Sequence, residues 1–180
     1  MDSVEEVIFE QWLLELKENG FIDNYEYHSS TLELIPEIRY NNIKIYNSLN
    51  YTPDFIIQWN ESAKGLFMLH QEEVVNTKFD NNQIMLSQFN NISYVDVKGL
   101  FAGKHNNSAI TFPILRKVLY DKLGIYVNKV VPKTLFQKTF TPNSYLTTSM
   151  NKERKINWEV LSLKEYIINA NTKRKLRNSK

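Results

Sequence analysis

An alternation of polar and apolar residues at 94–99 (YVDVKG) constrains the fold of this chain more than any other feature. Successive side chains of a strand point to opposite faces, so Asp96 and Lys98 share one face and the two valines lie on the other. A second strand-like segment, Phe55-Ile56-Ile57, directly follows Pro53-Asp54. The sequence therefore predicts two strands that each carry an acid beside buried apolar residues.

Asp54 and Asp96 would converge with Lys98 if Asp54 lies at the end of a neighbouring strand. Two carboxylates and an ammonium at one point are the groups that a divalent-metal site for phosphodiester hydrolysis needs. A carboxylate beside buried strand residues is costly unless it is paired or binds a metal. The alternative is a surface salt bridge between Asp96 and Lys98, and the spacing alone does not choose between the two.

Composition restricts the kind of metal and partner. The 180 residues include no cysteine, and the three histidines (His28, His70 and His105) lie at no metal-ligand spacing. A metal would have oxygen ligands, which favours Mg²⁺ or Mn²⁺ over Zn²⁺. The net charge is only +2, so nucleic-acid binding would need a local basic face.

Other classes of protein are disfavoured. No Gly-rich phosphate loop is present, which argues against a nucleotide-driven motor or a dehydrogenase. The acidic start at residues 1–6 lacks the basic region of a signal peptide, and no apolar run is long enough to span a bilayer. We therefore expect a soluble protein in the cytoplasm, with no membrane partner. The richness in Asn, Lys, Ile and Tyr is typical of an AT-rich genome such as that of a phage, in which case the cytoplasm would be the host cell's.

The order of expected elements indicates an α/β fold, with a mixed central β-sheet flanked by helices. Ser3 and Glu6 predict a capping box at the start of the first helix, which runs to Lys17. Residues 72–91 are predicted to be an excursion with a partial helix, and 99–107 a loop. The remaining expected elements are strands at 22–35, 38–49 (with a turn at Asn41-Asn42), 51–59, 66–70, 92–98 and 125–131, and helices at 114–122 and 158–169.

The domain organisation is expected to change beyond Pro132. We predict a core at 1–132, a peripheral extension at 133–170 packed on that core, and a basic disordered tail at 171–180. The extension mixes aromatic and basic residues, which suits either a nucleic-acid stacking surface or the core of a peripheral layer. Its aromatic residues are Phe136, Phe140, Tyr145 and Trp158, with Lys133, Lys138, Lys152, Arg154 and Lys155 between them.

The motif Pro53-Asp54 followed by Asp96-Val97-Lys98 resembles the signature of the PD-(D/E)XK nuclease superfamily. The longer strings 51–55 (YTPDF) and 95–99 (VDVKG) look like those of small phage-encoded nucleases related to Holliday-junction resolvases. The resemblance covers roughly the first two thirds of the chain. It implies a restriction-endonuclease-like core and metal-dependent hydrolysis of DNA, with Mg²⁺ or Mn²⁺ as cofactor.

The resemblance also implies roles for the residues of the motif. Asp54 and Asp96 would bind the catalytic metal, and the carbonyl of Val97 would add a ligand. Lys98 would either orient the attacking water and help to deprotonate it, or stabilise charge that develops on the phosphate.

Related nucleases take a third acid from the first helix, and Glu6 is the candidate. It shares a helix face with Phe9, Leu13 and Leu16, which is the side expected to be buried. Glu6 is also the acid of the capping box, a role that would explain it without catalysis. Glu10 and Glu5 are the alternatives.

Several basic residues are candidates for contact with DNA. Arg116 and Lys117 lie on the second expected helix, where related nucleases place a basic residue near the scissile phosphate. Lys104, in the loop after the catalytic strand, is a further candidate. In the basic tail, Lys173, Arg174 and Lys175 would add phosphate affinity that falls with salt.

The expected function is that of a metal-dependent deoxyribonuclease in recombination, repair or processing of DNA. Its substrate would be a branched junction, a duplex or a single strand. Symmetric cleavage of a junction would imply a C₂ homodimer. The alternative is a non-catalytic nucleic-acid-binding protein or phage assembly protein on the same scaffold.

Overall fold

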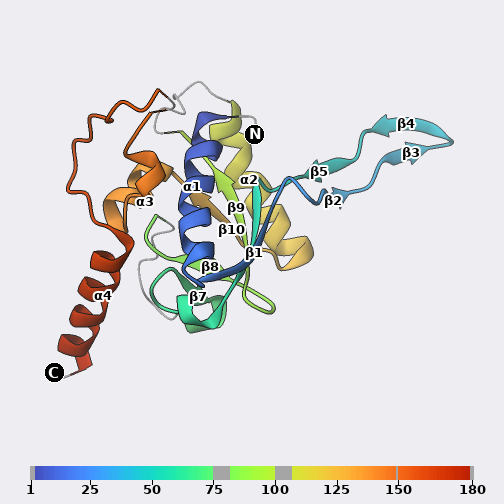
Figure 1. The fold of residues 1–180 in the computed structure, drawn as a ribbon. Helices are drawn as coiled ribbons and strands as arrows, with labels where there is room; N and C mark the ends of the chain where they lie inside the picture. Colours follow the sequence, from blue (N-terminus) through green and yellow to red (C-terminus); the bar gives the residue numbers. More distant parts are fainter. Residues whose placement is uncertain (1–2, 75–81, 100–106, 149, 179–180) are drawn as a thin grey trace.

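The computed structural model describes residues 3–74, 82–99, 107–148 and 150–178, and these form an α/β fold with a mixed sheet and four α-helices (Figure 1). The helices are α1 (Val4–Glu18), α2 (Asn107–Leu123), α3 (Pro132–Lys138) and α4 (Leu163–Asn178). The strands are β1 (Ile22–Tyr27), β2 (Leu32–Ile35), β3 (Ile38–Tyr40), β4 (Ile43–Tyr46), β5 (Leu49–Tyr51), β6 (Phe55–Trp59), β7 (Met68–His70), β8 (Met85–Ser87), β9 (Ile92–Val97) and β10 (Val127–Val130).

The main sheet has the strand order β1-β6-β9-β10. Strand β6 pairs antiparallel with β1 and β9, whereas β10 pairs parallel with β9. The two faces of the sheet have separate cores, since Val95 and Val97 pack with residues of α1 while Tyr94 packs with residues of α2. The predicted mixed sheet with flanking helices is confirmed, and so is the alternation that divides 94–97 between its faces.

Helix α1 begins as the sequence predicts. Ser3 Oγ accepts a hydrogen bond from the Glu6 amide, and the Glu6 carboxylate accepts one from the Ser3 amide, which completes the capping box. On the inner face Phe9, Leu13 and Leu16 are fully buried. Burial of this apolar face fixes α1 against the sheet.

Residues beyond 132 contribute to the same core as α1. Trp12 stacks on Phe140 with 5.7 Å between ring centroids, and its indole N–H donates to Thr139. Phe136, Phe140 and Tyr145 are buried, and Trp158 packs against the same cluster. Of the two alternatives for these four aromatic residues, packing in a core is therefore confirmed, and a stacking surface for nucleic acid is not observed for them.

Several predicted elements differ from the observed ones. The single strand predicted at 22–35 is two strands, because the chain turns at His28 with φ +45°. The segment 38–49 forms β3 and β4 and enters β5, and the predicted Asn41-Asn42 turn is present with φ of +47° and +64°. Strand β8 and helix α3 were not predicted, and α2 begins seven residues before the predicted start at 114. Helix α4 starts at Leu163 and continues to Asn178, so residues 171–178 are helical and not a disordered tail.

Two short ribbons of strands, β2–β5 and β3–β4, extend from the body of the protein as one arm (residues 32–51; Figure 1). At its root, Leu34 and Tyr51 are buried in a cluster with Phe112 and Leu119 of α2. The tip, β3–β4, is exposed at every residue of both strands. The arm is therefore held at its base and free along its outer half, as far as the described residues show.

No helix of the described segments is long and apolar enough to cross a membrane.

Candidate active site

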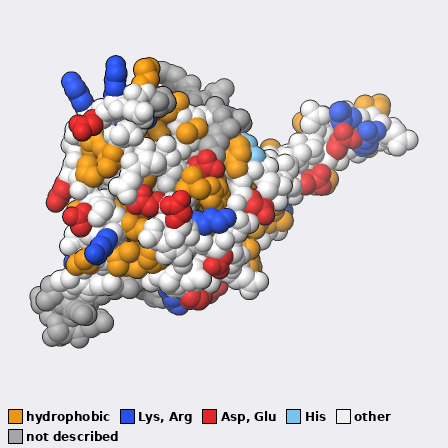
Figure 2. Space-filling model, in the orientation of Figure 1, with side chains coloured by type: hydrophobic (Ala, Val, Ile, Leu, Met, Phe, Trp, Pro, Cys, Tyr) orange, Lys and Arg blue, Asp and Glu red, His pale blue; other side chains and the backbone are white. Residues whose placement is uncertain are grey.

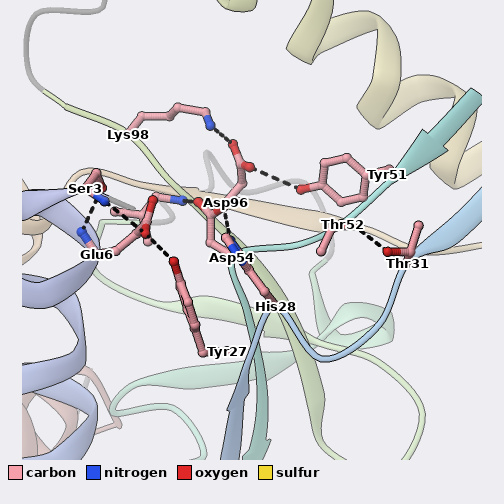
Figure 3. Close-up of polar contacts among 11 residues, drawn as sticks. Ser3, Glu6, Tyr27, His28, Thr31, Tyr51, Thr52, Asp54, Asp96 and Lys98 are labelled. Atoms are coloured by element: carbon pink, nitrogen blue, oxygen red, sulfur yellow. Dashed lines mark hydrogen bonds and ion pairs between the residues drawn. The ribbon is translucent and has the colours of Figure 1, made fainter. Parts of the chain in front are cut away.

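The two acids of the motif lie at the same edge of the main sheet. Asp54 directly precedes β6, and Asp96 is the penultimate residue of β9. Because β6 and β9 are antiparallel and Phe55 pairs with Val95, the start of β6 meets the end of β9. Figure 3 shows the two carboxylates beside each other, with Glu6 of α1 on one side and Tyr51 of β5 on the other.

Three groups hold Asp54. The Val97 amide donates a 2.6 Å hydrogen bond to its Oδ2, so the carboxylate is fixed to the neighbouring strand. His28 Nε2 lies 3.3 Å from Oδ1, and the His28 backbone amide donates to the Asp54 carbonyl. The His28 ring also stacks on Tyr27, with 4.0 Å between centroids.

Asp96 is held from two sides. The Tyr51 hydroxyl donates to Oδ1 at 3.3 Å, and Lys98 Nζ forms an ion pair with Oδ2 at 2.5 Å. The Asp96 side chain is only 5% exposed, whereas that of Lys98 is 26% exposed and lies over the Phe112 ring. The ion pair of the alternative interpretation is therefore present, but its acid is buried and not on the surface.

The surroundings of Asp54 and Asp96 disfavour the charged form of both carboxyl groups. Burial and the neighbouring Asp54 charge raise the pKa of Asp96 to about 6, although Lys98 opposes the shift. Burial also raises the pKa of Asp54, against the hydrogen bond from Val97 and the charge of Lys98. Burial and both carboxylates raise the pKa of Tyr51, which therefore stays protonated and donates its hydrogen bond. Perturbed carboxyls of this kind mark candidate functional sites.

Glu6 lies beside the pair. It is buried, as predicted from its position on the face of Phe9 and Leu13, and its charge contributes to the raised pKa of Asp54. Its Oε2 accepts hydrogen bonds from the Tyr27 hydroxyl at 2.8 Å and from the Ser3 amide at 3.2 Å. Its capping function is thus observed, and its function as a metal ligand stays a prediction.

The two alternative acids of α1 lie elsewhere. The Tyr25 hydroxyl donates to Glu10 Oε1 at 3.1 Å, which turns that carboxylate toward β1. Glu5 lies beside Gly99, where a Cβ on that glycine would come within 3.4 Å of Glu5 Oε1. Neither contributes to the pKa shift of Asp54 or Asp96, whereas Glu6 does.

The donors at this edge fit a hard divalent cation in part. Asp96 Oδ2 is buried, and beyond the Lys98 ammonium it has no hydrogen-bond donor among the described residues, so it keeps unused lone pairs. Within the described segments no three His, Asp or Glu side chains converge on one point. Mg²⁺ typically takes only one or two carboxylates and keeps several waters, so a pair such as Asp54 and Asp96 would be enough to bind it. For Val97 the contact observed is made by its amide, and ligation by its carbonyl stays a prediction.

The structure places one of the predicted DNA-binding residues, Arg116, near Tyr51. The Arg116 guanidinium stacks on the rings of Phe112 and Tyr126, at 5.7 and 4.9 Å, and its charge acts on Tyr51. Lys117 is exposed and lines, with Arg116 and Tyr126, a surface hollow of about 530 Å³. The basic residues 173–175 lie in α4, whose end is far from the start of α1 in Figure 1. Lys104 lies outside the described residues.

Three residues of the site were not predicted: Tyr27, His28 and Tyr51. Tyr51 stands three residues before Asp54 inside the string 51–55, which was the available signal. For Tyr27 and His28 the sequence offers no local signal, because they reach the acids only through the pairing of Tyr27 with Phe55.

Comparison with known proteins adds no relative from which a family could be assigned. No protein-family model, no curated protein and no solved structure matches this chain. The function is therefore argued from the site itself.

Proposed function

We propose that this protein is a metal-dependent deoxyribonuclease of the PD-(D/E)XK type, with a restriction-endonuclease-like core, that hydrolyses phosphodiester bonds of DNA. The observation that carries the proposal is the pair Asp54 and Asp96, a half-buried and a buried carboxylate on adjacent strand ends, with Lys98 paired to Asp96. Burial of two like charges is costly, and a bound cation would offset that cost.

Mg²⁺ or Mn²⁺ would be held by Asp54 and Asp96, and it would supply an activated water and neutralise phosphate charge. Other residues of the protein would orient the two carboxylates. Val97 and His28 keep the Asp54 carboxylate in place, and Tyr51 does the same for Asp96. Such fixed orientation lowers the reorganisation needed during reaction.

Lys98 is the candidate for the residue that acts on the reacting phosphate. With a cation bound to Asp96, the Lys98 ammonium would be free to orient the attacking water or to stabilise charge on the phosphate. The side chain is a quarter exposed and so can reach a substrate at this edge. Arg116, held on two aromatic rings near Tyr51, would bind a phosphate on the side of α2.

The test is cleavage of linear duplex, nicked, single-stranded and four-way-junction DNA by the purified protein with Mg²⁺ or Mn²⁺. Asp96→Asn and Lys98→Ala should each abolish cleavage while the protein stays folded. Lys64 and Glu73 form an ion pair elsewhere that is 39% exposed on both sides, so Lys64→Ala and Glu73→Gln are matched controls expected to retain activity.

Two outcomes would contradict the proposal. Cleavage that continues in excess chelator would exclude the metal, and wild-type rates for both Asp96→Asn and Lys98→Ala would exclude this site. Binding of DNA without cleavage of any substrate in the panel would instead favour a non-catalytic nucleic-acid-binding protein.

A further inference from the structure

The arm at residues 32–51 carries an apolar face that its own chain does not cover. Cross-strand pairing at the tip joins Ile38 with Tyr46 and Tyr40 with Ile43. Ile38 and Tyr40 are two residues apart on β3 and therefore point to the same face of the ribbon. Their exposed fractions are 47% and 70%, and those of Ile43 and Tyr46 are 65% and 66%.

The opposite face of the tip carries its charged side chains. Arg39 pairs across the strands with Lys44, and both cations form ion pairs with Glu37, at 2.5 and 3.5 Å. In Figure 2 blue and red side chains meet on the arm, with hydrophobic side chains along its edges. The tip is thus an amphipathic ribbon, with a charged side fit for water and an apolar side fit for burial.

A ribbon of this kind is unstable on its own. An isolated two-stranded hairpin is at best marginally stable in water, and an open strand edge is a template for pairing with another chain. Clustered exposed apolar residues on a protein surface commonly mark an interaction site. The apolar face of the tip is therefore a candidate interaction surface.

The charge of the arm argues for a protein and against DNA. Its charged residues are Glu33, Glu37, Arg39 and Lys44, so its net charge is zero, and both cations are already paired with Glu37. A surface for nucleic acid needs an excess of unpaired positive charge. A neutral surface, by contrast, meets a second copy of itself without repulsion.

We propose that the arm is a self-association surface, and that its apolar face packs against the arm of a second copy of this chain about a twofold axis. The four exposed side chains of the face present on the order of 500 Å² per protomer, against about 800 Å² per partner in a standard interface. Pairing of the open strand edges of the two arms supplies further contact through backbone hydrogen bonds.

This proposal does not rest on nuclease activity, but it bears on it. The root of the arm is part of the candidate active site, because Tyr51 ends β5 and donates to Asp96. Two chains joined through their arms would hold two such sites in one symmetric particle. That arrangement suits concerted cleavage of the two strands of a DNA substrate.

The experiment is the mass of the full chain in solution, measured by light scattering after size exclusion and by sedimentation velocity at micromolar concentrations. The wild type should be a dimer. Ile43→Thr with Tyr46→Thr should be a folded monomer, because threonine favours strands but removes the apolar surface. Phe89→Asn is the control, since Phe89 is 74% exposed in a turn with positive φ and Asn tolerates that backbone. It should remain a dimer.

Cross-linking provides a second measurement that needs no loss of packing. The chain has no cysteine, so Ile45→Cys introduces a single thiol on the arm and Ile114→Cys a single thiol on α2. On a non-reducing denaturing gel, mild oxidation should give disulfide-linked dimers of the arm variant and no covalent dimer of the α2 variant.

A monomeric wild type would overturn the proposal, as would a dimer that persists in the double threonine variant. If the wild type is a monomer and Ile43→Thr with Tyr46→Thr binds DNA more weakly than the wild type, the proposal is overturned and nucleic acid is the occupant of the arm. Each of these outcomes is read without an activity assay, so failure here is distinct from failure of the proposed function.

Discussion

At the scale of single residues, the charge of Asp96 depends on two opposing effects, burial beside Asp54 and the ion pair with Lys98. The acid has an ammonium 2.5 Å away, yet its pKa rises, because burial and the Asp54 charge outweigh Lys98. The carboxylate is therefore a source of instability in the protein without metal. Sites that bind a charged ligand are often less stable than a neutral version would be, and the stability is recovered on binding.

We predict that Asp96→Asn stabilises the protein in the absence of metal at about pH 8, by several degrees in Tm. Asparagine keeps the shape and the acceptor for Tyr51 but removes the buried charge. At about pH 4.5 wild-type Asp96 is already mostly protonated in the folded state, so the difference should be much smaller. Thermal melts of the wild type and of Asp96→Asn, with chelator at the two pH values, measure this difference in Tm. A lower Tm of Asp96→Asn at about pH 8 would mean that the ion pair with Lys98 is net stabilising.

We predict that Glu6→Gln reduces cleavage far more than stability. The glutamine oxygen can accept the same hydrogen bonds from Ser3 and Tyr27, and glutamine also serves in a capping box, so the helix start is kept. What is lost is a negative charge beside Asp54. Cleavage rate and Tm are compared with wild type.

Glu10→Gln is the matched control, because Glu10 accepts a hydrogen bond from Tyr25 in the same way on the next turn of α1. Near-normal cleavage by Glu6→Gln with an inactive Glu10→Gln would move the third acid along the helix. Normal cleavage by both would leave Asp54 and Asp96 as the side-chain ligands.

Residues of the site were predictable where the signal is local. Asp54, Asp96 and Lys98 follow from strand alternation and a short motif, and the structure gathers all three. His28 and Tyr51 were missed because their contacts depend on how distant strands pair. The left-handed backbone of His28, which breaks the predicted long strand, is also not encoded by a Gly or Pro.

At the scale of elements, prediction succeeded where periodicity was strong. Helix α1 has a capping box and a clear apolar face, and β9 alternates between the two faces of the sheet at 94–97. Helix α3 is only seven residues long and β8 only three, and such short elements show no period. Helix α4 was predicted to end early because its second half is basic. Its first half is fixed by the buried Leu163 and Tyr166, and the helix continues from there.

We predict that the basic half of α4 adds affinity for DNA without a part in the chemical step. Lys173→Gln, Arg174→Gln and Lys175→Gln together keep helix-forming residues but remove three charges. Affinity for DNA should fall at low salt, and the slope of log K against log salt should decrease by about 2 to 3. The cleavage rate at saturating DNA should not change.

Fluorescence anisotropy over a salt series measures this change, with circular dichroism to check that the helix remains. Lys152→Gln with Lys155→Gln, at exposed or half-exposed positions outside α4, is the control for total charge. An unchanged salt slope in the triple variant would show that this helix does not touch DNA.

At the scale of the whole molecule, the hydrophobic core extends across the predicted boundary between residues 1–132 and the extension, and this matters for stability. Residues from both sides of that boundary share one core, in which Trp12 and Phe67 contact Phe140, and Phe67 also contacts Tyr166. We predict that residues 1–132 alone do not fold, because removal of several fully buried aromatic residues costs more than a small domain can lose. A cooperative thermal transition of the 1–132 fragment would contradict this.

The last prediction links metal, pH and stability of the intact chain. Because the folded pKa of Asp96 is about 6 and its ordinary value is near 3.8, the folded state binds more protons than the unfolded state between these pH values. Stability without metal should therefore fall as pH rises through that window and be lowest above about pH 6.

Mg²⁺ competes with protons for the same carboxylates, so it should raise Tm above about pH 7 and have little effect near pH 5. A total gain of about 2 to 3 kcal/mol corresponds to Mg²⁺ at about 100 times its Kd. NaCl at matched ionic strength controls for screening, and Asp96→Asn should abolish the Mg²⁺ response at every pH. A Mg²⁺ effect that is equal in Asp96→Asn, or equal at both pH values, would place the cation elsewhere on the protein.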